Sequence, residues 1–212
     1  MKDQEHIIGT YNATAENYAA TRIHELSSKP LDRLLLREFA SLNQSKGKCA
    51  DFGCGPGHVT EFLHSNGMKD IVGIDISSEM VKTARKYFPG IEFEWGDLLN
   101  LSYDDGYFAS AISFYSIVNF DRDQLTIAIK EIHRVLKSGA ELLLSFHVGE
   151  GLVHFDKAGD VDVNVDMYFW TSNAILELLG NHGFETITAF ERLPYLAVEY
   201  NSKRGYIWAR RT

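Results

Sequence analysis

Three glycines at alternate positions, Gly53, Gly55 and Gly57, follow a short apolar segment at residues 48–52 and precede an apolar helical pattern. Glycine allows the backbone to turn sharply and lets a ligand approach without meeting a Cβ atom. In an α/β sheet this first turn lies at the carboxyl edge, where ligands bind and where a helix N-terminus offers free N–H groups. The segment therefore predicts a ligand-binding loop near the beginning of an α/β domain.

The segments after this loop alternate between short apolar runs and amphipathic helical patterns. Five strands are predicted first, at residues 48–52, 71–74, 91–95, 108–115 and 141–147. Two further strands, at 186–191 and 205–210, have no helical pattern between them and should pair antiparallel. We predict one domain over residues 1–212, of the α/β class, with a doubly wound, mostly parallel seven-stranded sheet, an antiparallel final strand pair and helices on both faces.

The composition limits the classes of function. The formal net charge is −8, whereas nucleic-acid binding draws on a basic face, so no nucleic-acid partner is expected. Cys49 and Cys54 do not make a disulfide scaffold or stand at zinc spacing, so no metal site is predicted. The first ten residues lack the apolar core of a signal peptide, and no segment approaches 18 continuous apolar residues. We therefore expect a cytoplasmic protein without a membrane partner, either a monomer or a homodimer.

The spacing of the glycines separates two classes of cofactor. The dinucleotide fingerprint G-x-G-x-x-G/A would require glycine or alanine at position 58, which is His58. The third glycine stands at position 57 instead, and the acidic Asp51 precedes the loop. A nicotinamide-dependent oxidoreductase is therefore an alternative that the loop disfavours, and the antiparallel final strand pair disfavours it as well.

Residues 50–57, Ala-Asp-Phe-Gly-Cys-Gly-Pro-Gly, resemble the first motif of the class I S-adenosylmethionine-dependent methyltransferases, particularly their small-molecule branch. The resemblance extends over about residues 30–210, with several motifs in the expected order. It implies a Rossmann-like fold and in-line transfer of a methyl group from S-adenosylmethionine to a small-molecule acceptor, with S-adenosylhomocysteine as product. The alternative is a non-catalytic cofactor-binding or interaction protein on the same fold, but its loop should be degraded, and here every glycine and acid is in place.

The resemblance also implies roles for individual residues around this loop. Gly53, Gly55 and Gly57 would pass beside the methionine and ribose portions of the cofactor. Asp51 would fix the loop and hold the amino group, directly or through water. Asp75 ends the second predicted strand, and its two oxygens would accept both ribose hydroxyls.

The adenine and methionine portions have implied contacts of their own. Ile76 would lie against adenine, and Asp97, with Leu98 beside it, would accept from the adenine amino group. Tyr115 belongs to residues 113–119, a segment that lines the methionine arm in the family and opens toward the acceptor. Many relatives carry a histidine near position 119, where this chain has Asn119.

The N-terminal residues are similar to a helix that folds over the cofactor in the family. Tyr11 and Tyr18 lie seven residues apart, which places both on one helix face. We therefore predict that residues 1–29 form a lid over the cofactor.

The acceptor side carries weaker signals. His147 stands at the carboxyl end of the fifth predicted strand and titrates near neutrality, so it is the first candidate for a general base. A hydrogen-bonded histidine at a strand end is the alternative. Residues 148–170 are predicted as an insertion on the substrate side, and candidates within it for lining an acceptor pocket are His154, Asp166, Tyr168 and Trp170. The identity of the acceptor, and the atom that is methylated, do not follow from the residues.

Overall fold

The computed structural model describes residues 4–158, 160–196 and 198–212. Its α-helices are α1 (Glu5–Arg22), α2 (Pro30–Asn43), α3 (His58–Ser65), α4 (Ser78–Tyr87), α5 (Arg122–Val135) and α6 (Ser172–Asn181). Its strands are β1 (Cys49–Phe52), β2 (Ile71–Asp75), β3 (Glu92–Trp95), β4 (Phe108–Phe114), β5 (Leu136–Val148), β6 (Leu152–Ala158), β7 (Val161–Tyr168), β8 (Phe184–Arg192) and β9 (Lys203–Arg211).

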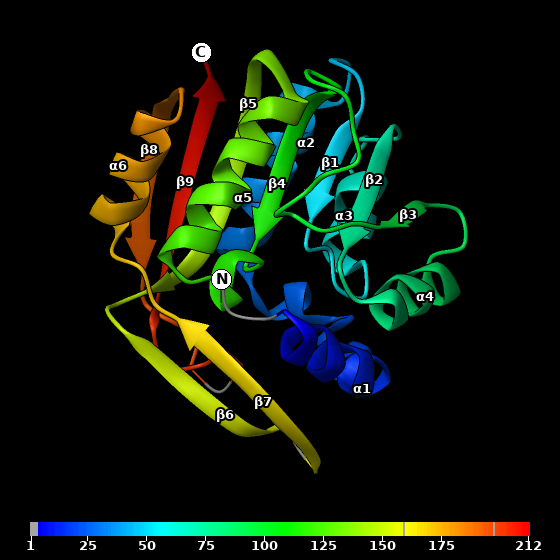
Figure 1. Cartoon of the computed structure of the whole chain (residues 1–212). Helices are drawn as coiled ribbons and strands as arrows, with labels where there is room; N and C mark the ends of the chain where they lie inside the picture. The colour runs from blue at the N-terminus through cyan, green and yellow to red at the C-terminus, as the bar shows by residue number, and fades with distance from the viewer. Residues whose placement is uncertain (1–3, 159, 197) are drawn as a thin grey trace.

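Among the described residues, seven strands form one sheet in the order β3-β2-β1-β4-β5-β9-β8 (Figure 1). Strands β1 to β5 pair in parallel, whereas β9 runs antiparallel to both β5 and β8. The predicted α/β class, the mostly parallel seven-stranded sheet and the antiparallel final pair are confirmed. The sequence did not predict that the last strand would insert between β5 and β8.

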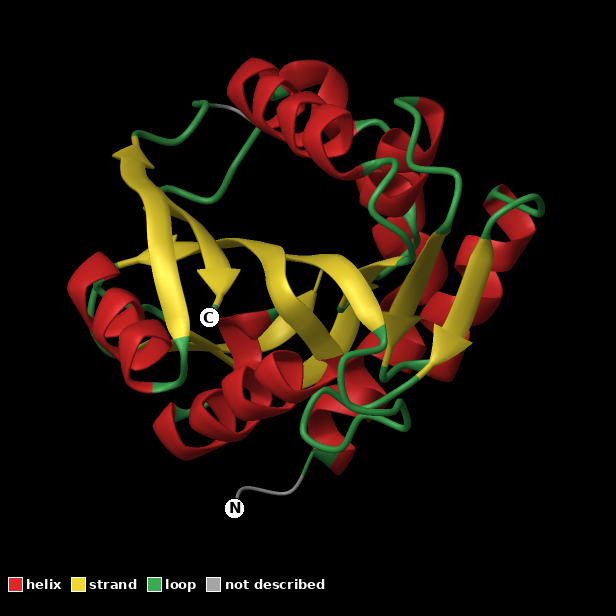
Figure 2. Cartoon of the chain, turned by 90° about the horizontal axis from the view of Figure 1, so that it is seen from above, coloured by secondary structure: helices red, strands yellow, loops and turns green. Residues whose placement is uncertain are grey.

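Helices cover both faces of the sheet, as predicted (Figure 2). Leu125 of α5 belongs to the apolar cluster on one face, and Leu36 of α2 belongs to the cluster on the other. Strand residues alternate between the two clusters, so Leu142 contacts the first and Leu143 the second. This arrangement explains why β5 carries an uninterrupted apolar run, and it leaves the carboxyl edge of the sheet open for a site.

Residues 148–170 contain a β-hairpin. Strands β6 and β7 pair antiparallel and form a separate two-stranded sheet that extends below the carboxyl edge of the main sheet (Figure 1). The sequence carries the signal for β7, because Val161, Val163 and Val165 alternate with polar residues, but this segment was predicted only as an insertion.

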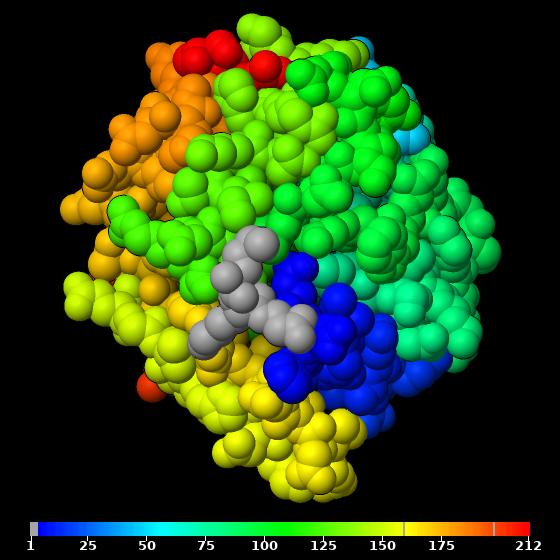
Figure 3. Space-filling model, viewed as in Figure 1, coloured from blue at the N-terminus to red at the C-terminus, as the bar shows by residue number. Residues whose placement is uncertain are grey.

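Helix α1 lies across the same edge, between the hairpin and α4 (Figure 3). Its buried residues are small or polar, including Thr14, Ala15 and Ala19, which lets the helix lie close to its neighbours. Asn12 fixes its position, because its Oδ1 accepts hydrogen bonds from Ser77 Oγ (2.7 Å) and from the backbone of Glu79 (3.3 Å) at the beginning of α4. No helix among the described residues is long and apolar enough to cross a bilayer.

Candidate active site

A cavity, here called the loop cavity, lies at the carboxyl ends of β1, β2 and β4 beneath α1. It is lined by ten of the residues predicted to bind the cofactor, namely Tyr11, Tyr18, Asp51, Gly53, Gly55, Asp75, Ile76, Asp97, Leu98 and Tyr115. These residues come from five separate segments of the chain. The carboxyl ends of parallel strands meet at one edge, which is why their side chains converge.

The carboxylate of Asp75 holds the glycine loop in place. Its Oδ2 accepts from the backbone N–H of Gly55 (2.8 Å), and its Oδ1 accepts from that of Ser77 (2.9 Å). Burial raises the pKa of Asp75, and these two hydrogen bonds oppose the rise. Each carboxylate oxygen keeps a second lone pair, which is available to a ligand hydroxyl.

Each of the three loop positions holds a glycine for a different physical reason. All three have positive φ, a conformation that disfavours other residues. A Cβ atom on Gly57 would lie 2.6 Å from the ring of Phe93, and one on Gly53 would lie 2.2 Å from Cβ of Ser116. A Cβ atom on Gly55 would meet nothing within 4 Å. Gly57 is absent from the cavity lining and serves packing, whereas Gly55 leaves open space on the cavity side.

Asp51 is buried behind the loop, with 1% of its surface exposed. Its Oδ2 accepts a hydrogen bond from Thr60 Oγ1 (2.6 Å). Burial raises the pKa of Asp51 to about 7, although the bond from Thr60 opposes the rise. The carboxyl is therefore poised to lose its proton when a cation arrives beside it.

Asp97 and Ile76 also line the loop cavity, and hydrogen bonds to nearby residues fix their positions. Asp97 Oδ1 accepts from the backbone N–H of Leu99 (2.8 Å), which closes the turn after β3. The backbone oxygen of Ile76 accepts from the indole N–H of Trp95 (2.8 Å).

Sequence reasoning missed Glu25 and His58 as site residues, although both line the loop cavity. His58 Nε2 lies 3.2 Å from Glu25 Oε1, and Lys29 Nζ lies 3.0 Å from the same oxygen. Burial alone would raise the pKa of Glu25, but His58 and Lys29 outweigh it and hold the pKa well below its usual range. Since Glu25 is ionised and can only accept, Nε2 of His58 carries a proton. His58 Nδ1 is buried and has no hydrogen-bond partner among the described residues.

A second cavity, here called the hairpin cavity, lies between α1, the hairpin and the beginning of β9. It has a volume of about 690 Å³, within the range of about 300–1,000 Å³ typical of small-molecule sites. Both cavities are lined by Tyr11, Tyr18, Glu25 and Tyr115, so these four residues mark where one cavity meets the other.

The chain matches known proteins over this whole arrangement. Residues 50–139 match a family model described as a methyltransferase domain. A ubiquinone/menaquinone biosynthesis C-methyltransferase of Campylobacter jejuni is 30% identical over 98% of this chain and 88% of its own length. This chain is a class I S-adenosylmethionine-dependent methyltransferase.

Solved structures agree with the fold of this methyltransferase. The magnesium protoporphyrin IX methyltransferase of Synechocystis, solved with bound S-adenosylmethionine, has a TM-score of 0.73, with 18% identity over 100% of this chain and 98% of that one. A Methanosarcina mazei S-adenosylmethionine-dependent methyltransferase has a TM-score of 0.70, with 21% identity over 79% of this chain and 93% of that one. The match to the Campylobacter jejuni relative, together with the family model, confirms the predicted family, the enzyme class and S-adenosylmethionine as cofactor.

Tyr115 lies in a strained conformation where the two cavities of the methyltransferase meet. Its φ is +58°, the left-handed region that non-glycine residues rarely adopt. The backbone N–H of Tyr115 donates to Ser145 Oγ (3.0 Å), and its hydroxyl lies 2.8 Å from that of Tyr206. Such a conformation persists only where the surroundings fix it, and it is frequent at functional sites.

A buried ionic network supports Tyr115 from behind. Tyr206 donates its hydroxyl to Asp32, which also accepts from Arg192 (2.8 Å). Arg192 makes two further bonds to the Glu199 carboxylate, at 2.7 and 2.8 Å. Burial alone would raise the pKa of Glu199, but the bonds from Arg192 lower it to about 2.

His147 lines the hairpin cavity of the methyltransferase and not the loop cavity. Burial and the positive charge of Arg204 lower its pKa to about 3, so the imidazole is neutral near pH 7. The predicted base therefore lies in the hairpin cavity, and its catalytic role stays a prediction.

The other four acceptor-side candidates are absent from the hairpin-cavity lining. The residues that line it from the hairpin include Phe155, Val163, Val165 and Met167, whereas His154 and Asp166 pair with each other across the strands. Successive strand residues point to opposite faces, so the adjacent residues face the cavity.

Proposed function

We propose that the methyltransferase binds S-adenosylmethionine in the loop cavity and a small-molecule acceptor in the hairpin cavity. The observation that carries this proposal is that Tyr11, Tyr18, Glu25 and Tyr115 line both cavities. When bound, the cofactor supplies a methyl group on a sulfonium; a lone pair of the acceptor bonds to the methyl carbon as the carbon–sulfur bond breaks, and the bonding pair stays on sulfur. Positioning of the acceptor on the line behind the methyl group can remove on the order of 7–11 kcal/mol of the barrier.

The donors and acceptors around the loop cavity fit this cofactor. Asp75 keeps lone pairs for the two ribose hydroxyls while its other lone pairs hold the loop. Gly55 leaves space for the ligand, and Asp97 offers its carboxylate to the adenine amino group. Ile76 and Leu98 supply apolar contact for the adenine ring.

The methionine end of the cofactor has a matching set of acceptors. His58 Nδ1 is buried without a hydrogen-bond partner among the described residues, and a polar group at the methionine end of the cofactor would satisfy it. Asp51 and the ionised Glu25 face the same cavity, so their charges favour both the ammonium and the sulfonium. We assign His58 and Glu25 to the cofactor site together with Asp51.

Tyr11 and Tyr18 supply the covering wall of the site. Tyr11 donates a hydrogen bond to Asn119 Oδ1 (2.6 Å), and its ring lies edge-on to that of Tyr18 with centroids 6.5 Å apart. The lid is predicted over residues 1–29, of which residues 1–3 lie outside the described part of the chain. We propose that α1 forms the main part of this lid and that it opens to admit the cofactor.

The acceptor is a ring compound in this proposal. The hairpin cavity has an aromatic end, since its lining includes the His147 imidazole, whose centroid lies 5.6 Å from that of the Tyr115 ring and 6.0 Å from that of the Tyr200 ring. The Campylobacter jejuni relative is named for ubiquinone and menaquinone biosynthesis, and quinones are ring compounds. Aromatic walls favour such ligands because rings pack edge-to-face or offset at these separations.

Calorimetric titration with S-adenosylhomocysteine tests the cofactor site. We expect micromolar binding by the wild-type protein and binding at least 10-fold weaker for Asp75→Ala, because a hydrogen bond to a charged group contributes about 1.5–3 kcal/mol. Asp70→Ala is the matched control, since Asp70 immediately precedes the same strand and its side chain is 63% exposed. Unchanged affinity in Asp75→Ala, or an equal loss in Asp70→Ala, would contradict the assignment.

A further inference from the structure

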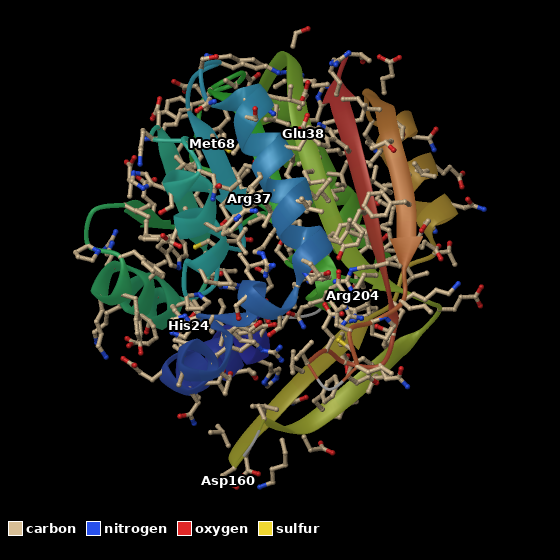
Figure 4. The ribbon with its side chains drawn as sticks, turned by 180° about the vertical axis from the view of Figure 1, so that it is seen from behind. His24, Arg37, Glu38, Met68, Asp160 and Arg204 are labelled. Atoms are coloured by element: carbon tan, nitrogen blue, oxygen red, sulfur yellow. The ribbon has the colours of Figure 1, made fainter. Side chains whose placement is uncertain are left out.

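The cavity that receives the acceptor has an excess of positive charge at one end. Lys29 and Arg204 are nearly buried and lie on the Tyr115 ring, with Lys29 Nζ at 5.3 Å and Arg204 Cζ at 5.7 Å from its centroid. Figure 4 labels Arg204 at the beginning of β9 above the hairpin, and Asp160 at the far tip of the hairpin. The charged end of the cavity is therefore the end next to the sheet.

The carboxylates at this end pair both with the cations of the cavity and with groups outside it. Glu199 accepts two bonds from Arg192 and lies 3.6 Å from Lys29 and 3.8 Å from Arg204. Glu25 pairs with Arg22 and Lys29. At this end of the cavity, the three cations Arg22, Lys29 and Arg204 are therefore balanced by only two carboxylates. These carboxylates also bind Arg192 and His58, which do not line the cavity.

The charges around His147 produce a net positive electrostatic potential there, as the excess of cations implies. Besides burial, the charges of Arg204, Lys29 and Arg22 lower the pKa of His147, and only Glu199 among its principal neighbours opposes them. Protonation of the imidazole is therefore disfavoured in this cavity, while a negative charge is favoured.

The hydrogen bonds around His147 accommodate a tautomer that donates from Nε2. Arg204 donates to Ser202 Oγ (2.7 Å), and that oxygen lies 2.7 Å from His147 Nδ1. A serine hydroxyl has one proton and two lone pairs, so Ser202 can accept from Arg204 and still donate its proton to Nδ1. With that bond made, the neutral imidazole carries its proton on Nε2, and this atom is then a donor.

We propose that the acceptor is a ring compound with an ionised oxygen acid, a carboxylate or a phenolate, and that His147 donates Nε2–H to this group instead of removing a proton. Arg204 and Lys29 supply the compensating charge, and the apolar hairpin residues Phe155, Val165 and Met167 cover the rest of the ligand. His147 is then a positioning residue, which differs from the general base that the sequence predicts. This inference rests on the proposed function, because it takes the hairpin cavity as the acceptor site.

Two probes of nearly equal shape test the preference for an anion. Binding of 2-naphthoate and of the neutral 2-naphthamide is measured by calorimetry on protein saturated with S-adenosylhomocysteine. We expect the carboxylate to bind at least tenfold more tightly than the amide. Equal affinity, tighter binding of the amide, or no binding of either compound would overturn the proposal.

Variants test whether the preference for 2-naphthoate arises from the charged end of the cavity. Arg204→Met and Lys29→Met should each reduce the preference for 2-naphthoate at least threefold, whereas Arg210→Met should leave it unchanged. Arg210 lies on the same strand β9, is 46% exposed and pairs with Glu141 outside the cavity. A preference that persists in both cavity variants would contradict the proposal.

Two further variants test the role of His147. They also keep the proposal testable if Arg204→Met fails to fold. The side-chain amide of His147→Gln reproduces a donor at the position of Nε2, but it cannot act as a base, so this variant should keep the preference for 2-naphthoate. His147→Phe removes the donor and should lose most of it. Equal loss in both variants would refute the donor role. Titration of each variant with S-adenosylhomocysteine is the separate readout, because loss of that binding signals failure of the cofactor site and not of this inference.

Discussion

The Tyr11 hydroxyl donates a 2.6 Å hydrogen bond to Asn119 Oδ1, across 108 residues of sequence. Asn119 in turn donates its Nδ2 to the backbone oxygen of Asp166 in the hairpin (2.8 Å). The side-chain amide of Asn119 therefore connects α1, which covers the loop cavity, with the hairpin, which covers the hairpin cavity. Both coverings are fixed to the short turn that follows β4.

This connection gives the first prediction. Tyr11→Phe removes one hydrogen bond, which contributes about 0.5–1.5 kcal/mol, and leaves the ring in place. We expect S-adenosylhomocysteine to dissociate faster, with affinity lowered up to about tenfold, as measured by stopped-flow fluorescence and calorimetry. Tyr87→Phe, at the exposed end of α4, should bind like wild type. An unchanged dissociation rate in Tyr11→Phe would show that the bond does not hold α1 closed.

The packing of Gly57 gives a prediction about stability. Alanine at this position would combine a φ of +84° with a Cβ atom 2.6 Å from the Phe93 ring. We expect Gly57→Ala to lower the free energy of unfolding by about 2–4 kcal/mol, as measured by urea denaturation. Gly90→Ala is the control, because that Cβ meets nothing within 4 Å and Gly90 has no positive φ. Similar losses in the two variants would argue against the steric account.

The pKa of Asp51 predicts how cofactor affinity depends on pH. Burial raises this pKa to about 7, whereas the unfolded chain has a value near 3.9. The free protein therefore loses stability as pH rises from about 4 to about 7, because the folded state must bury the charge. A cofactor ammonium beside Asp51 favours the ionised carboxylate, so binding releases a proton.

We accordingly expect the dissociation constant of S-adenosylhomocysteine to rise roughly five- to tenfold between pH 7.5 and pH 6. Calorimetry in buffers of different ionisation enthalpy should detect the proton released near pH 6.5. Asp51→Asn cannot titrate, so its affinity should vary less over this range. If the wild type and Asp51→Asn have the same pH dependence, another group is responsible.

The buried ionic network predicts a large cost when its central cation is removed. Arg192→Met leaves the side chains of Asp32 and Glu199, which are 0% and 1% exposed, without their main counterion. We expect a loss of about 3–5 kcal/mol in the free energy of unfolding, as measured by urea denaturation. Lys203→Met breaks an exposed ion pair to Glu191 and should change stability by less than about 1 kcal/mol. A loss below about 1 kcal/mol in Arg192→Met would contradict the role assigned to the network.

Most of the residues predicted to bind the cofactor line one cavity, and they could be selected from the sequence because their signals are local. The glycine loop and Asp51 occupy seven consecutive residues, Asp75 ends the second predicted strand, and Asp97 follows the third by two residues. A parallel sheet then brings these strand ends to one edge without further information. The hairpin, in contrast, was missed although its alternating valines carry the signal.

The remaining site residues could not be predicted because they depend on contacts between distant segments. His58 pairs with Glu25 across 33 residues, and Tyr206 donates to Asp32 across 174. Phe155 lines the hairpin cavity and the adjacent His154 does not, because successive strand residues point to opposite faces. The sequence does not say which face of the hairpin turns inward.

The sequence alone determined the class of fold, the cofactor loop and its acids, because strand ends and short spacings are local properties. Only the tertiary structure decided the pairing of the last strand with β5, the place of α1 over the site and the charged end of the hairpin cavity. The contact between His147 Nδ1 and Ser202 belongs to the second group, since Ser202 directly precedes another strand, β9. Such features depend on which segments pack together, and packing is a property of the folded chain as a whole.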